Sequence, residues 1–358
     1  MTRNTQAHPY AHLNRSDWWY PQDLSQEGND RHVTLNESQV AQFRHDGFLV
    51  VDGLWSSELI QKASDEARRL HPSKEVAKKT HSGSNRGFSA MPWTQSGEKA
   101  PEESLNQMSV YPRALAAAAQ LMETETINIR LSQSHVIAKH GHSSQAGGVL
   151  QIEGDQDIHV DYGNNTLLVP PRTTAPEAVA CLCYYSNVEE SGGSTHFAKA
   201  SEGELTTYEP ETFNPPNFVI GTKNGSAATT SGPRSIDKVN QRYNDEKPVY
   251  YKPGTCILYR LDAWHRGTPA AINKTRYTHH HVWRHREAEW INWQSLAPRL
   301  SGMPSRYLES LSVVQRTVLG FAAPGDGYWT TETVDSVGQR YPGMNMGPYR
   351  EAMNTSPR

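Results

Sequence analysis

Three side chains of this 358-residue sequence have the types and spacing of a metal site. His159 and Asp161 are separated by one residue in a strand-like run, so the two-residue period of a strand sends both to the same face. His265 stands between an apolar run and a turn containing Gly267, a sensible place at the mouth of a barrel. Two imidazoles and one carboxylate hold one side of a redox-active iron(II) ion and leave the other side open. We therefore expect His159, Asp161 and His265 to be metal ligands at a catalytic centre.

A fourth residue strengthens this prediction, because a His-x-Asp triplet alone is weak evidence in a chain with 16 histidines. Arg276 follows His265 by 11 residues (276 − 265) and begins the next strand-like run, so a hairpin return would bring its guanidinium back towards the metal. The planar fork of an arginine holds a carboxylate with two parallel hydrogen bonds, which lysine does less well. Arg276 is therefore expected to bind the distal carboxylate of a dicarboxylic keto acid.

Several motifs carry a family resemblance across roughly residues 34 to 285: FRHDGFLVV at 43–51, HVD at 159–161, GGSTHF at 192–197, YKPG at 251–254, WHRG at 264–267, and Arg276. With them the chain resembles the phytanoyl-CoA dioxygenase family of iron(II)/2-oxoglutarate-dependent oxygenases. The resemblance implies that His159, Asp161 and His265 bind Fe(2+), that Arg276 anchors 2-oxoglutarate, and that Gln133 contacts it. It also implies hydroxylation of a small-molecule metabolite, with 2-oxoglutarate and O2 converted to succinate and CO2 and with ascorbate as a candidate stimulant.

Some features limit what the resemblance implies. Gly267 stands where many relatives carry serine, and Leu182 where many carry an aromatic residue, so the remaining co-substrate contacts stay open. Asp161 argues against a related halogenase, because those enzymes have a small residue in place of this carboxylate. Desaturation, epoxidation and ring closure remain alternatives to hydroxylation. The substrate is equally open among acyl-CoA thioesters, free metabolites and natural-product intermediates.

Two other classes of protein compete with the oxygenase. One is a non-catalytic or differently metallated jelly-roll binding protein, which the fold alone does not exclude. The other is a metal-dependent isomerase or hydrolase on a cupin-like barrel, which would have no need of Arg276.

Further polar and aromatic residues are weaker candidates for the site. His140 and His142 lie in a Gly/Ser-rich segment, where we expect solvated side chains. By strand parity His280 shares a face with Arg276, whereas Trp264 and Tyr162 should point away from the metal. Arg86 and Trp93 belong to a long segment, residues 81–112, that has the composition of a lid or substrate loop.

The elements that position these residues form a mainly β pattern with flanking helices. Helices are expected from Thr34 or Asn36, from Ser56 to Leu70, and over 114–122. A half-buried strand is expected over 126–139, with Ile127, Ile129, Leu131, Gln133, His135 and Ile137 on one face. Short strands follow at 158–162, 166–169, 179–185, 194–197, 248–251, 255–261 and 276–284, separated by Gly/Pro turns. This pattern predicts a double-stranded β-helix, that is, a jelly-roll or cupin-like core.

Composition and length bound the remaining expectations. We expect a loosely ordered N-terminal arm over 1–33, held to the body by Trp18 to Tyr20, and a catalytic domain over 34–285. A helical or irregular C-terminal extension over 286–358, with a helix near 306–319, is expected to pack on the core.

The charge balance bears on the binding partner. Thirty-five basic against 38 acidic residues, without a basic stripe, argue against nucleic acid and favour a small-molecule partner. Three cysteines cannot form a disulfide framework, and no apolar stretch suits a signal peptide or a membrane span. We expect a cytoplasmic protein with buried thiols, no membrane association and no obligate protein partner.

Overall fold

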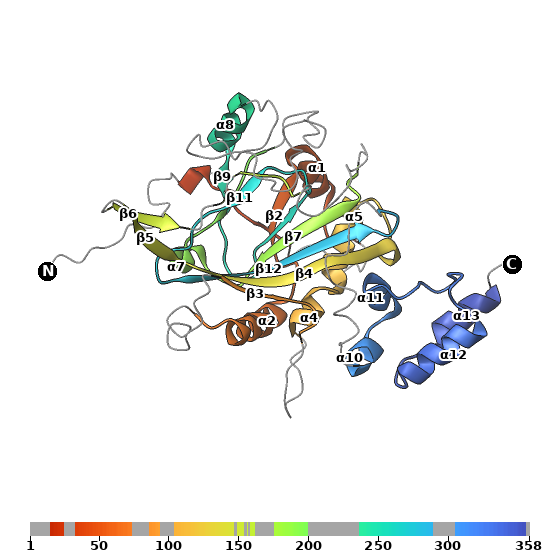
Figure 1. Ribbon diagram of the computed structural model, residues 1–358. Coiled ribbons are helices and arrows are strands. Elements are labelled where there is room, and N and C mark those ends of the chain that lie inside the picture. The colour runs from red at the N-terminus through yellow and green to blue at the C-terminus, as the bar shows by residue number, and fades with distance from the viewer. Residues whose placement is uncertain are drawn as a thin grey trace.

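The computed structural model describes residues 15–24, 33–73, 86–93, 104–146, 149–153, 156, 158–161, 175–199, 236–288 and 305–355. Two β-sheets form its centre (Figure 1). Helices lie against one face of the larger sheet, and one further helix lies on the side of the smaller sheet.

The larger sheet has seven strands in the order β1-β2-β10-β7-β12-β4-β3. Only the β1–β2 pair is parallel, and the other neighbours are antiparallel. Most strands that are neighbours in this sheet are far apart in the sequence. This order is that of a jelly-roll and differs from a meander, in which consecutive strands pair. The strands are β1 (Gln22–Asp23), β2 (Phe48–Asp52), β3 (Arg86–Ala90), β4 (Ile129–His140), β7 (Ala178–Tyr184), β10 (Cys256–Tyr259) and β12 (Thr275–His285).

The smaller sheet has the order β11-β8-β9 and faces the larger one across a cavity lined by residues of both sheets. Its strands are β8 (Thr195–Phe197), β9 (Lys247–Pro248) and β11 (His265–Gly267), and a separate hairpin joins β5 (His142–Ala146) to β6 (Val149–Glu153). The predicted fold class, mainly β with flanking helices and a jelly-roll core, is confirmed.

Helices surround these sheets, and their ends follow from local sequence. Asn36 begins α1 with a capping box shared with Gln39, Gly47 ends it in the left-handed conformation at φ 82, and Ser56 caps α2. The helices are α1 (Glu37–Asp46), α2 (Ser57–Leu70), α4 (Ser104–Met108), α5 (Pro112–Leu121), α7 (Val188–Ser191), α8 (Ile236–Asp245), α10 (Ser305–Ser310), α11 (Val313–Val318), α12 (Thr331–Arg340) and α13 (Gly347–Thr355), with short 3-10 turns at Arg15–Asp17 and Thr126–Asn128.

Two apolar clusters hold this architecture together. The first packs the outer face of the larger sheet against α2, α4, α5 and the C-terminal helices, and it contains the free, buried thiols of Cys181, Cys183 and Cys256. The second fills one end of the space between the sheets, where Phe48 of β2 packs on Phe197 of β8. Filling only one end leaves the other end open, and the candidate site lies there.

Strand β4 departs from the predicted alternation. Gln133 pairs with Val282, but the next pair is Leu131 with Trp283, so Ser132 is an extra residue, a β-bulge. The bulge moves Ile129 and Leu131 into the helix-covered core, while Gln133, His135 and Ile137 line the cavity between the sheets. The prediction that these residues all share one face was therefore wrong, because it assumed an unbroken two-residue period.

Several other predictions differ from the structure. The expected long loop over 81–112 contains β3 and α4, and the single helix expected near 306–319 is two, α10 and α11. The expected strand at 166–169 lies outside the described residues. In the described part of the expected arm, Trp18 is buried and β1 pairs with β2. None of the helices in the described ranges combines the length and the apolar character needed to cross a bilayer.

Candidate metal centre

His159, Asp161 and His265 converge as the sequence predicts. Their nearest nitrogen and carboxylate oxygen atoms all lie within 4.8 Å of one another, and no other such cluster of potential ligands occurs among the described residues. Asp161 Oδ1 is 3.9 Å from His159 Nε2 and 3.8 Å from His265 Nε2. Atoms at these separations can share one ion, so the geometry is that of a site for two imidazoles and one carboxylate.

Backbone pairing brings the ligands together. His159 and His265 form an antiparallel bridge in which each backbone N–H donates to the other residue's carbonyl at 2.9 Å. The backbone N–H of Asp161 donates to the Leu261 carbonyl at 2.8 Å, so a further backbone hydrogen bond ties this segment to the chain that precedes His265. The expected strand at 158–162 is thus a short extended segment, held by a single bridge in its described part.

Hydrogen bonds orient two of the three ligands. His265 Nδ1 lies 2.9 Å from the carbonyl oxygen of Ala263, and because a carbonyl only accepts, Nδ1 carries the proton and Nε2 keeps its lone pair. The phenol of Tyr259 donates to Asp161 Oδ2 at 3.0 Å, so Oδ1 is the oxygen left facing the histidines. Burial lowers the pKa of His265 to about 4. The ring is therefore neutral at physiological pH, the form in which it binds a metal.

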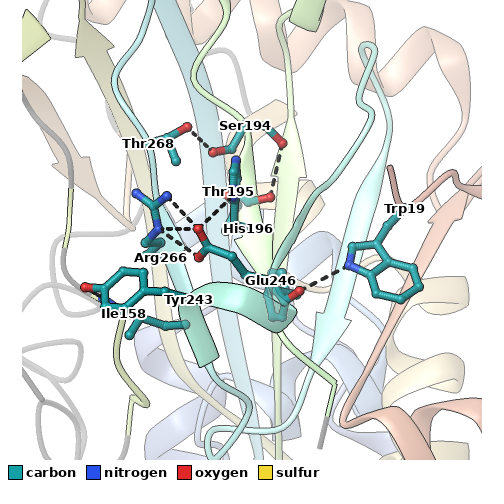
Figure 2. Close-up of polar contacts among 10 residues, drawn as sticks. Trp19, Ile158, Ser194, Thr195, His196, Tyr243, Glu246, Arg266 and Thr268 are labelled. Atoms are coloured by element: carbon teal, nitrogen blue, oxygen red, sulfur yellow. Dashed lines mark hydrogen bonds and ion pairs between the residues drawn. The ribbon is translucent and has the colours of Figure 1, made fainter. Parts of the chain in front are cut away.

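A buried ion pair joins Arg266 of β11 to Glu246, the residue that follows α8 (Figure 2). Arg266 donates to the Glu246 carboxylate through Nε, at 3.0 and 2.8 Å, and through its terminal nitrogen at 2.6 Å. His196 of β8 approaches the same carboxylate at 3.2 Å. Burial raises the pKa of the Glu246 carboxyl, but the bonds to His196 and Arg266 outweigh it, and the pKa lies below its ordinary value. Glu246 thus stays charged and ties together β8 and β11, the strand that begins with His265.

Tyr243 of α8 holds the other ligand segment. Its hydroxyl accepts the backbone N–H of Ile158 at 3.0 Å, immediately before His159, and the Arg266 guanidinium lies 5.7 Å from the centre of its ring (Figure 2). Helix α8 and the residue after it therefore contact the segments of both histidine ligands. Sequence reasoning missed Tyr243, Glu246 and Tyr259. Tyr259 carried a signal, because it begins the segment leading to His265, whereas nothing in the sequence links Glu246 to Arg266.

The triad opens into a cavity of about 340 Å³ between the sheets. Arg276 of β12 lines it and is 7 % exposed, and its guanidinium donates to the Thr268 carbonyl at 3.4 Å. Lys139 of β4 donates to the same carbonyl at 3.2 Å. Among the described residues no carboxylate forms an ion pair with Arg276, and its Nε has no hydrogen-bond partner. One end of the cavity is thus positively charged and suited to an anion.

Gln133 lies on the cavity wall, and its contact with 2-oxoglutarate stays a prediction. Its amide nitrogen is 2.7 Å from His135 Nδ1, and the ring of His135 stacks on that of His280, with centroids 4.8 Å apart. Thr278 Oγ1 is 3.0 Å from His280 Nε2. His280 therefore faces the cavity with Arg276, as strand parity predicts.

The weaker candidates are distributed as follows. His140 is buried and lies 2.9 Å from Thr275 Oγ1, so the expectation that it is solvated was wrong. Trp93 is in the helix-covered core and donates to Ser89, so it is not a cavity residue. Trp264 packs away from the metal, as parity predicts. Tyr162 and the side chains of Arg86 and His142 lie outside the described residues.

No protein-family model and no curated protein matches the chain. Similar solved structures include the epimerase SnoN in complex with Fe3+, alpha ketoglutarate and nogalamycin RO, with 16% identity over 70% of this chain and 83% of that chain and a TM-score of 0.48. The alpha ketoglutarate-dependent carbocyclase SnoK has 15% identity over 77% and 94%, with a TM-score of 0.49. HygX from Streptomyces hygroscopicus, with nickel, 2-oxoglutarate and hygromycin B bound, has 14% identity over 71% and 88%, with a TM-score of 0.43.

The resemblance to the phytanoyl-CoA dioxygenase family stays a prediction.

Proposed function

We propose that this protein is an iron(II)- and 2-oxoglutarate-dependent oxygenase of the phytanoyl-CoA dioxygenase type. The observation that carries the proposal is the presence, in one cavity, of a His-Asp-His triad and a buried arginine with no anionic partner among the described residues. A metal site alone would suit many functions. A metal site together with an arginine that needs a carboxylate suits a keto acid that binds at both ends.

The residues present fit the proposed groups. Nitrogen and carboxylate donors on one side of the site are the set that non-haem iron oxygenases use, with the remaining positions open to the cavity. Iron bound there would supply the redox chemistry that couples dioxygen to decarboxylation of the keto acid. The unpartnered Nε of Arg276 is a donor that a carboxylate in the cavity would satisfy.

The chain's own contribution is positioning. His159, Asp161 and His265 hold the ion, and Tyr259 fixes which carboxylate oxygen faces it. Arg276 binds the distal carboxylate and so aims the keto acid group at the metal. The Arg266–Glu246 pair keeps β11 in place while the cavity fills.

The outcome that we propose is hydroxylation of a small-molecule metabolite in the cytoplasm, with 2-oxoglutarate and O2 converted to succinate and CO2. Asp161 supports an oxygenase over a halogenase, because the carboxylate fills the position that a halide would need. Desaturation, epoxidation and ring closure stay alternatives, because the same residues would serve each of them.

The test is oxygen-dependent turnover of 2-oxoglutarate. The purified protein, supplied with iron(II), ascorbate and dioxygen, should form succinate even without its substrate, and Asp161→Ala should not. A wild-type protein that binds the metal and 2-oxoglutarate but forms no succinate in the presence of a broad metabolite panel would instead be a binding protein. Turnover without oxygen would favour an isomerase or a hydrolase.

A further inference from the structure

Gly267 and Gln156 form a close contact at the positively charged end of the cavity. The backbone N–H of Gln156 donates to the Gly267 carbonyl at 3.0 Å, and the backbone N–H of Gly267 donates to Gln156 Oε1 at 2.8 Å. Both residues line the same cavity as Arg276. The side chain of Gln156 is therefore folded back over the β11 strand that follows His265.

The absence of a side chain at position 267 is what admits this arrangement. A Cβ at Gly267 would stand 2.5 Å from Gln156 Oε1 and 3.6 Å from Arg276 Nη2. The first distance is too short for any real contact, so a residue larger than glycine would displace the carboxamide. The second shows that a terminal nitrogen of Arg276 also lies close to this point.

The hydrogen bond also determines which way the carboxamide faces. An N–H group needs an acceptor, so the oxygen of Gln156 faces Gly267 and the NH2 group, with its two donors, faces elsewhere. No described residue accepts a hydrogen bond from that NH2 group. A neutral donor beside a guanidinium is a good complement to a carboxylate, whose two oxygens have more acceptor sites than one arginine fills.

We propose that Gln156 is a further co-substrate-binding residue, whose NH2 group donates to the distal carboxylate of a dicarboxylic keto acid held by Arg276, and that Gly267 is required to admit it. The proposal rests on the proposed function for the identity of that keto acid, 2-oxoglutarate. Together, Arg276 and Gln156 select a dicarboxylic keto acid over one without the second carboxylate.

The test compares two keto acids on the metal-loaded protein without oxygen. Pyruvate has the metal-binding keto acid group of 2-oxoglutarate but lacks its distal carboxylate. The ratio of the two dissociation constants therefore isolates the contribution of the distal carboxylate to binding. Gln156→Glu is the sharpest variant, because its carboxylate can still accept from Gly267 but offers no donor and repels the ligand. Gln107→Glu is the matched control, since Gln107 is exposed on α4 and does not line the cavity.

Gln156→Ala should weaken 2-oxoglutarate binding by roughly tenfold, the usual effect of losing one hydrogen bond to a charged group, and Gln156→Glu should weaken it further. Pyruvate binding should stay within about twofold in both variants, and the control should match the wild type in both titrations. Equal 2-oxoglutarate-to-pyruvate ratios in wild type and Gln156→Glu would overturn the proposal.

A double-mutant cycle tests the part assigned to Gly267. Gly267→Ala should weaken 2-oxoglutarate binding by displacing Gln156, and adding Gln156→Ala should then cost little more. Additive effects would show that the two residues act separately and would contradict the coupling. If wild type itself binds 2-oxoglutarate no better than pyruvate, the proposed function fails and not merely the role of Gln156.

Discussion

Replacing Arg276 by alanine removes the one buried cation that the proposed function assigns to the co-substrate. Arg276 is 7 % exposed and lines the cavity, so solvent screens its pairing with a bound carboxylate only weakly. Truncating one partner of such a buried pair costs about 2–5 kcal/mol, largely because the other charge is left unpaired. At about 1.4 kcal/mol per tenfold, Arg276→Ala should raise the dissociation constant for 2-oxoglutarate by at least roughly thirtyfold.

The assay is an anaerobic titration of the metal-loaded variants with 2-oxoglutarate and, separately, with pyruvate. Arg276→Lys keeps the charge but loses the fork, so it should fall between wild type and Arg276→Ala. Metal affinity and pyruvate affinity should change little, because neither depends on the distal end of the cavity. If Arg276→Ala binds 2-oxoglutarate as tightly as the wild type does, the co-substrate assignment is refuted.

Three further changes test the rest of the site and the core. Tyr259→Phe removes the bond to Asp161 Oδ2 and should weaken iron(II) or cobalt(II) binding by roughly 10- to 100-fold, with wild-type affinity as the contrary result. Glu246→Gln removes the carboxylate that pairs with the buried Arg266 and should lower the free energy of unfolding by about 3–5 kcal/mol in urea titrations, and an unchanged midpoint would contradict this. Burial lowers the pKa of His281 to about 3 from 6.5, so the unfolded chain takes up a proton that the folded state excludes and stability falls as pH falls between these values. His281→Phe should flatten that slope by up to roughly 1.4 kcal/mol per pH unit, and identical slopes would refute the assignment.

The candidate site was predictable from sequence because its key residues follow local rules. Strand parity alone aims His159 and Asp161 at one point. Arg276 lines the same cavity as His265, as predicted, but the expected hairpin return was wrong, because β11 and β12 belong to different sheets that face each other across the cavity. The jelly-roll class was predictable for a similar reason, since short apolar runs between Gly/Pro turns have few other ways to bury their faces.

The remaining features depend on tertiary pairing that no local pattern records. The bulge at Ser132 shifts the register between β4 and β12, and it exchanges the faces of residues only a few positions apart. Glu246 reaches Arg266 across 20 residues of chain, and Gln156 reaches Gly267 across 111. Each contact is decided by which segments the sheets bring together, so the sequence contained the residues without indicating their partners.

The central claim is that one keto acid binds the metal at the triad and Arg276 at its other end. Its most direct test is the visible spectrum of the iron(II)-loaded protein as 2-oxoglutarate is added without oxygen. Chelation of the iron by the keto acid should produce a charge-transfer band that saturates with 2-oxoglutarate, is absent from Asp161→Ala, and needs far higher concentrations in Arg276→Ala. An iron-loaded wild-type protein that shows no such band at saturating 2-oxoglutarate would contradict the claim.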